Sequence, residues 1–187
     1  MDTYLTAGTY PATDRAAELE WLHAARSGEQ WALDELYRRH YSQIYALCYR
    51  ILGRSEDAED AMQAAFVHAF RELPGFRGDC LARTWLYRIA TNEAINALRK
   101  RKRSVSDAEI ESSALAPDDA PAVHRKIAVT AALDELRPDH HVILVLRYWE
   151  DLSYDEICSV LGLSMPTVKM RLSRARGEFR RRYGDEP

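Results

Sequence analysis

The sequence predicts an all-helical (all-α) protein in which two small helical domains are joined by a flexible linker. From residue 15 onward, apolar residues recur at helical spacing almost everywhere, and no stretch alternates long enough to form a strand. Residues 104–123 combine Ser, Ala, Asp and two prolines with few large apolar side chains, which is typical of a linker. We therefore expect a loose tail over 1–14 and domains over 15–103 and 124–184.

The composition fits two packed domains. The chain has 187 residues, of which 47% are hydrophobic, enough to give each domain a core. No apolar run approaches the roughly 20 residues that span a bilayer, and the chain begins with acidic and polar residues. We therefore expect a cytoplasmic protein without membrane insertion. The three cysteines form no C-x-x-C pair, so neither a disulfide framework nor a metal site is predicted.

Basic residues gather in two places although the net charge is -3. Residues 99–103 are an unbroken basic run, and residues 169–182 hold many arginines and a single acidic residue. The linker between these segments is acidic. This distribution predicts two DNA-facing patches separated by a segment that DNA repels. Solvated helix ends around a disordered loop would give the same charge pattern.

Three helices are predicted in the first domain. They cover residues 31–52, residues 56–73, and a segment that starts near residue 84 and continues into the basic run. Ser55 is a candidate cap for the second of these helices, and Pro74 with Gly75 ends it. The stretch over 76–83 has no regular periodicity and reads as a loop.

The second domain is predicted to begin with a helix that Pro138 ends. Pro138 can then open the next helix, over residues 139–150. The side chains of that helix expected to face inward are Val142, Val145, Leu146 and Trp149.

Two short helices follow and predict a helix-turn-helix. Ser153 and Glu156 have the spacing of a capping box, Gly162 can take the positive φ of a sharp turn, and Ser164 can cap the second helix. This arrangement leaves the second helix free to enter a major groove. An ordinary helical hairpin with a solvated basic face is the alternative.

The second of these helices has one apolar side and one polar side. Its core side is predicted to consist of Val168, Leu172, Ala175 and Phe179. Its candidate DNA-binding residues are Thr167, Lys169, Met170, Arg171, Ser173, Arg174 and Arg176. Lys169 can donate to guanine, Met170 can touch a thymine methyl, and the arginines suit phosphates.

Both domains resemble sigma-70 family proteins, and the chain is similar to extracytoplasmic-function (ECF) sigma factors over about residues 18–183. In the second domain, the resemblance to region 4 is carried by residues 152–157, 161–164, 167–169 and 171–176. In the first domain, the resemblance to region 2 is carried by residues 32–37, 57–60, 76–79 and 84–90, with Gln63 and Asn92.

The resemblance implies a transcription initiation factor that binds core RNA polymerase, recognises and melts promoter DNA, and is controlled by an anti-sigma factor. The first domain would bind the β′ clamp helices, and the second would read the minus-thirty-five element as duplex and contact the β flap. The implied polymerase-binding residues are Asp57, Asp60, Gln63 and Val67. The family usually has an acidic residue after the glutamine, where this chain has Ala64. No cofactor is implied, and we expect the free protein to be monomeric.

The resemblance also implies that the first domain captures the melted minus-ten strand. The candidate residues are Phe76, Arg77, Gly78, Asp79, Trp85, Arg88, Asn92, Asn96, Arg99 and Lys100. A loop at 76–84 can surround a base flipped out of the stack, and its contacts must offset an unstacking cost of a few kcal/mol. Trp85 shares its helix with apolar residues, so a place in the core is the alternative to stacking on a base.

No catalytic motif is present: the sequence has no Gly-rich phosphate loop, no H-E-x-x-H and no nucleophile elbow, so we do not expect an enzyme. Two other functions stay open. One is a stand-alone repressor or activator that uses only the second domain, which would normally dimerise. The other is a regulator that holds polymerase without reading DNA.

Overall fold

The computed structural model describes residues 22–106 and 121–183, and within these it describes the side chains of 22–101 and 128–183. The predicted tail over 1–14 and most of the predicted linker, residues 107–120, lie outside the described residues. The elements are α2 (Gln30–Leu52), α3 (Ser55–Glu72), the 3-10 turn η1 (Leu73–Gly75), α4 (Ala82–Ser106), α5 (Pro121–Asp134), α6 (Pro138–Tyr148), α7 (Tyr154–Leu161) and α8 (Met165–Tyr183). A short helical segment over residues 22–26 precedes α2. The predicted all-helical class is confirmed.

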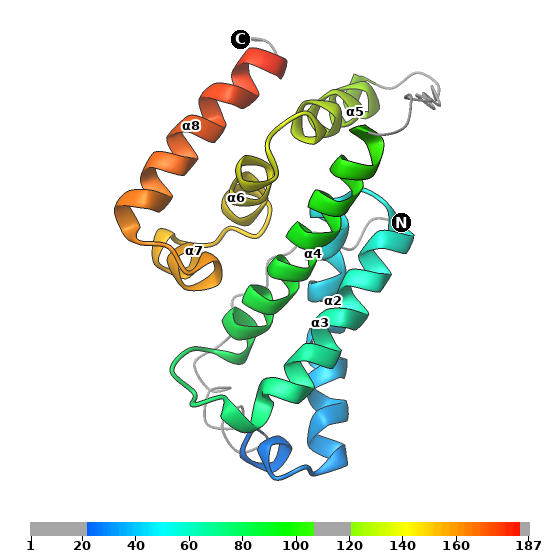
Figure 1. Cartoon of the computed structure of the whole chain (residues 1–187), viewed down its shortest axis with the longest axis vertical. Helices are drawn as coiled ribbons and strands as arrows, with labels where there is room; N and C mark the ends of the chain where they lie inside the picture. The colour runs from blue at the N-terminus through cyan, green and yellow to red at the C-terminus, as the bar shows by residue number, and fades with distance from the viewer. Residues whose placement is uncertain (1–21, 107–120, 184–187) are drawn as a thin grey trace.

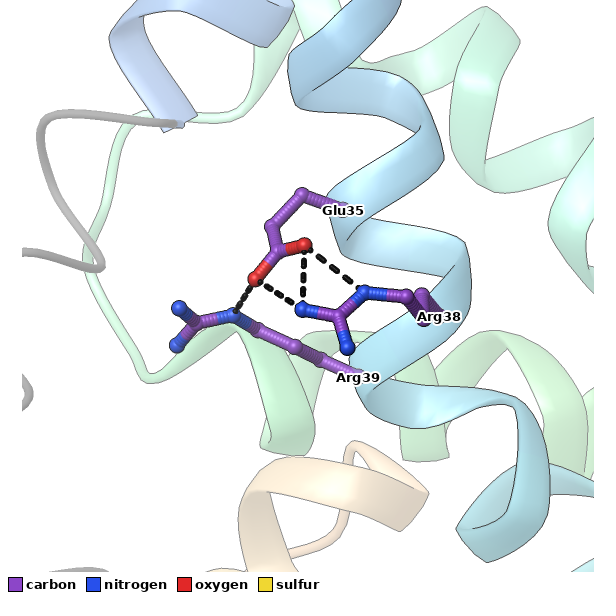
Figure 2. Close-up of polar contacts among 3 residues, drawn as sticks. All are labelled: Glu35, Arg38 and Arg39. Carbon is purple, nitrogen blue, oxygen red and sulfur yellow. Dashed lines mark hydrogen bonds and ion pairs between the residues drawn. The ribbon is translucent and has the colours of Figure 1, made fainter.

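The first domain is built around α2, α3 and α4, which pack against one another (Figure 1). Each helix buries an apolar stripe at helical spacing, and Leu36, Ile44 and Leu86 are 0–1% exposed. Burying one such side chain contributes about 1.5–3 kcal/mol relative to leaving it in water. The solvent side of α2 carries ion pairs instead, where Glu35 accepts hydrogen bonds from Arg38 and Arg39 (Figure 2).

The start of α3 differs from the prediction. Ser55 is already helical, and the N-cap is Arg54, which makes no side-chain capping hydrogen bond. The chain turns at Gly53, which ends α2 with a φ of 73°, and one extended residue then suffices to begin α3. The prediction that Ser55 caps this helix is therefore wrong, while Glu56 and Asp57 lie in its first turn as the helix dipole favours.

The second domain contains α5 to α8, with α8 lying against α5, α6 and α7 (Figure 1). The predicted capping box is confirmed: the Ser153 hydroxyl accepts from the Glu156 amide at 3.2 Å, and the Ser153 amide donates to the Glu156 carboxylate at 2.8 Å. Gly162 ends α7 with a φ of 63°, a conformation that costs glycine little and other residues more. Helix α8 then begins three residues later, which completes the helix-turn-helix.

The end of α6 corrects another prediction. Val142, Val145 and Leu146 are buried as expected, but Trp149 is 39% exposed. Helix α6 ends at Tyr148, so Trp149 follows the last helical turn and no longer continues the inward stripe. The next residue, Glu150, is buried in its place.

His40 is a buried polar residue of α2 at 2% exposure. Burial, together with the nearby charges of Arg83 and Arg39, lowers its pKa from 6.5 to about 4. The folded protein therefore holds His40 neutral over a pH range in which the unfolded chain takes up a proton.

This difference predicts that acid weakens the fold through His40. As pH falls from 6.5 toward 4, the unfolded chain binds the proton first, so the free energy of unfolding should fall by up to about 3 kcal/mol. The variant His40→Gln should show a shallower decline in urea denaturation at pH 7, 5.5 and 4. The exposed His23, changed to Gln, is the matched control and should keep the wild-type slope; an unchanged slope in His40→Gln would contradict the prediction.

Candidate nucleic-acid interface

Helix α8 presents one polar face because its opposite side is fixed in the core. Val168, Leu172 and Ala175 are 0–1% exposed, and Phe179 packs against them. Among the predicted DNA-binding residues, Lys169, Met170, Ser173, Arg174 and Arg176 are exposed, whereas Thr167 and Arg171 are half-buried. The structure therefore exposes five of the seven predicted residues and leaves Thr167 and Arg171 at the margin of the buried side.

The single acidic residue within the basic part of α8 points inward. Glu178 is 9% exposed, accepts a hydrogen bond from His140 of α6, and pairs with Arg182 at 2.9 Å. Although burial opposes it, hydrogen bonds from His140 and Arg182 hold the pKa of Glu178 below its ordinary value. Turning this carboxylate into the domain leaves the outer face of α8 cationic, as phosphate binding requires.

The loop between η1 and α4 borders a pocket of about 560 Å³. Its lining consists of Arg71, Glu72, Gly75, Phe76, Arg77, Asp79, Cys80, Trp85 and Arg88. Gly78, with a φ of 77°, supplies the left-handed turn of the loop. The floor is aromatic, because the Phe76 and Trp85 rings stack with centroids 4.7 Å apart. Trp85 is 2% exposed, which favours the core interpretation over a freely accessible stacking platform.

A polar stripe continues from this pocket along α4. Arg88, Asn92 and Asn96 are exposed and follow one another at intervals of four residues, so they lie on one face of the helix. Arg99 is exposed one turn further on, beside Lys100. The exposed members of the predicted set thus follow α4 from the pocket to its basic end, whereas Phe76 and Trp85 are buried.

Part of the basic run has structural roles. Arg101 donates to the Leu52 carbonyl at 2.6 Å, at the end of α2, and pairs with Asp57 of α3 at 3.4 Å. Arg99 pairs with Asp139 of the second domain at 3.1 Å. A run of like charges in the sequence therefore divides into residues that hold the fold and residues that face outward.

The predicted polymerase-binding residues lie on the side of α3 opposite its apolar stripe. Asp60, Gln63 and Val67 are exposed on one face, whereas Asp57 is half-buried and is held by Arg101. Tyr37 of α2, which was not among the predicted residues, is 40% exposed, and its ring centroid lies 4.7 Å from that of the buried Phe66. The spacing of four residues between the tyrosines of α2 was the available signal.

The second domain carries an apolar groove that the sequence analysis also missed. It has a volume of about 260 Å³ and lies between α5, α6 and α8. Its lining consists of Leu133, Leu144, Tyr148, Trp149, Arg176, Phe179 and Arg180. Tyr148 and Trp149 are 56% and 39% exposed, so the groove offers aromatic surface with arginines beside it.

No helix in the described segments combines the length and the apolar character that a bilayer crossing needs. In the same segments, no three His, Cys, Asp or Glu side chains lie together as metal ligands would.

Two family models match the chain. The model for Sigma-70 region 2 covers residues 36–104, and the model for Sigma-70, region 4 covers residues 126–178. Among curated relatives, the ECF RNA polymerase sigma factor SigM of Mycobacterium tuberculosis is 32% identical over 97% of this chain and 92% of its own length. The ECF RNA polymerase sigma factor SigW of Bacillus subtilis is 34% identical over 86% of this chain and 93% of its own length.

Solved structures of similar fold agree. CnrH, in complex with the cytosolic domain of CnrY, is 26% identical with a TM-score of 0.63 over 87% of this chain and 94% of CnrH. The sigma factor RpoE of Bartonella quintana, in complex with the anti-sigma factor NepR, is 23% identical with a TM-score of 0.58 over 95% of this chain and 100% of RpoE. Sigma factors are transcription initiation factors and not enzymes. With both regions matched in order and its relatives matched nearly end to end, the chain belongs to the sigma-70 family, among its ECF RNA polymerase sigma factors.

Proposed function

We propose that this sigma factor binds the β′ clamp helices of core RNA polymerase through α3, captures a melted minus-ten strand with its first domain, and reads the minus-thirty-five element with α8. The observation that carries the proposal is the pairing of two polar surfaces, one on each domain, whose helices are fixed by buried apolar stripes on their opposite sides. The protein would act in the cytoplasm, where its polymerase works.

The exposed face of α8 supports duplex reading in a major groove. Lys169 and Met170 lie in the first turns of α8, where a recognition helix contacts base edges. The ammonium of Lys169 can donate to guanine, while Arg174 and Arg176 suit the flanking phosphates. Thr167 bonds to the Ser164 hydroxyl at 2.8 Å and is better placed to order the turn than to read a base.

The pocket beside Phe76 supports capture of a flipped base. Its volume falls within the range of about 300–1,000 Å³ of small-molecule sites, so one base fits. The exposed Arg77, Asp79 and Arg88 would supply polar contacts to the base, while the buried Phe76 and Trp85 rings would support the pocket from within the core. Asn92 and Asn96 would contact the neighbouring bases, and Arg99 and Lys100 the phosphates.

The groove on the second domain is our candidate for the β flap. A helix segment with an apolar side would cover Tyr148 and Trp149, and Arg180 would meet an acidic residue at its margin. We further propose control by an anti-sigma factor. Support comes from RpoE of Bartonella quintana, a protein of similar fold that was solved in complex with the anti-sigma factor NepR.

Promoter-specific transcription tests the proposal. Purified protein and core polymerase, incubated with genomic fragments of the source organism, should yield discrete run-off transcripts that core polymerase alone does not make. A stand-alone repressor would instead bind a two-fold duplex site without polymerase, and a polymerase-holding regulator would bind core polymerase without giving transcripts. Failure to associate with core polymerase would refute the proposal.

Removing the Lys169 ammonium should weaken recognition of the minus-thirty-five element. If Lys169 donates to a base, Lys169→Ala should cost about 1–3 kcal/mol, or roughly 5- to 150-fold in affinity, on the preferred element alone. Gel-shift titration of the holoenzyme on the preferred and a scrambled element measures the difference. Arg181→Ala, an exposed change further along α8, should affect both duplexes alike; equal losses for Lys169→Ala on both would show a phosphate contact instead.

Placing a bulky charge at Gln63 should weaken polymerase binding and leave the fold intact. The side chain is exposed at the centre of the α3 surface, so Gln63→Arg creates a clash at the interface without disturbing the core. Competition with a labelled sigma factor for core polymerase should give at least about tenfold weaker binding, equal to 1.4 kcal/mol. Ser42→Arg, which also introduces an arginine at an exposed position, but on α2, should bind core polymerase normally. Wild-type affinity in Gln63→Arg would show that the polymerase interface does not include this part of α3.

A further inference from the structure

The two domains pack against each other, so the described residues form one continuous core. Helix α6 of the second domain lies against α4 and α2 of the first, and α7 lies against α4, as Figure 1 shows for α6 and α7 beside α4. Buried apolar residues of both domains belong to the same cluster.

A carboxylate lies buried at the seam between the two domains. Glu150 of the second domain is 6% exposed, forms an ion pair with Arg50 of α2, and accepts a hydrogen bond from the Tyr87 hydroxyl of α4 at 2.8 Å. The Arg83 guanidinium lies 4.7 Å from the centre of the Tyr87 ring and donates to the same hydroxyl at 3.4 Å. Burial, with the adjacent Glu150 charge, raises the pKa of Tyr87, which keeps the phenol protonated as a donor.

A second carboxylate bridges the domains near the candidate DNA-binding surfaces. Asp139 of α6 pairs with Arg99 of α4 at 3.1 Å and with Arg171 of α8 at 3.8 Å. Arg99 belongs to the proposed minus-ten surface and Arg171 to the proposed minus-thirty-five surface. In this conformer both arginines are engaged by one acidic side chain.

Distance shows that this arrangement cannot serve both promoter elements. Elements at minus ten and minus thirty-five are separated by roughly 25 base pairs, or about 85 Å of duplex at 3.4 Å per base pair. Here Arg99 and Arg171 reach the same carboxylate. The domains must separate before each meets its own element. The domains can separate because fifteen Cα steps join Ser106 at the end of α4 to Pro121 at the start of α5. These steps allow at most about 50 Å between the two helix ends.

We propose that Arg50, Tyr87 and Glu150 form a clasp that keeps the free protein in this closed conformer, with Arg99 and Arg171 withheld from DNA until the clasp opens. The effect on DNA binding rests on the proposed function, whereas the closed conformer itself does not. A polar clasp suits reversible opening because its charged groups are hydrated again when the domains separate. A substitution that removes one partner instead leaves the other charge buried and unpaired in the closed conformer, which destabilises that conformer.

Small-angle X-ray scattering of the full chain tests the closure. Wild-type protein should have a radius of gyration close to that of one compact body, roughly 16 Å for 187 residues. Glu150→Gln and Arg50→Gln should both increase it and add a second maximum to the pair-distance distribution, with helical content unchanged by circular dichroism. The neighbouring exposed residues provide controls with the same charge changes, Asp151→Asn and Arg54→Gln, which should stay compact.

Binding of a random-sequence 30-base-pair duplex by the free protein tests the consequence. Opening should release two cations to phosphates, so the slope of log affinity against log salt should steepen by about 2 in both clasp variants and not in the controls. If either clasp variant stays compact, or opens without a steeper slope, the clasp is refuted. If the variants open and bind more steeply but no variant supports transcription, the proposed function fails and the clasp stands.

Discussion

Burial of α4 on two flanks is the constraint on which the rest of the structure depends. One flank packs against α2 and α3, and the other packs against α6 and α7 of the second domain. Trp85, Leu86 and Leu98 are at most 2% exposed, and each such side chain contributes about 1.5–3 kcal/mol by leaving water. With these positions fixed, Arg88 and Asn92 can face only outward. The proposed DNA surface of the first domain is thus a consequence of core packing.

Core packing also determines which face of α8 is exposed. Its apolar side is fixed by Val168 and Leu172, and its one inward-facing acid, Glu178, is satisfied by His140 and Arg182. The Ser153 capping box starts the preceding helix α7, and the positive φ of Gly162 sets the turn between α7 and α8. Local backbone chemistry therefore orients the helix, and burial selects which of its faces meets solvent.

Arginine has several roles in this protein, and its count alone says little about DNA binding. Arg101 closes the end of α2 and holds Asp57, Arg50 pairs with a buried carboxylate across the domain seam, and Arg88 is exposed. Only an exposed arginine such as Arg88 can contact a DNA phosphate without a change in the protein. Ion pairs between the two domains can therefore lower the affinity of the protein for DNA by occupying arginines, although the net charge of the protein stays the same.

The sequence by itself determined the helical class, the order of the helices and the helix-turn-helix, because these depend on interactions between residues at most four positions apart. The Ser153 and Glu156 box and the Gly162 turn are of this kind, and both are confirmed. Only the tertiary structure decided that Trp149 faces solvent, that Arg54 rather than Ser55 precedes α3, and that Glu150 is buried. Tyr87 and Arg50 reach Glu150 across 63 and 100 positions of the chain, and no local pattern records a contact between residues so far apart.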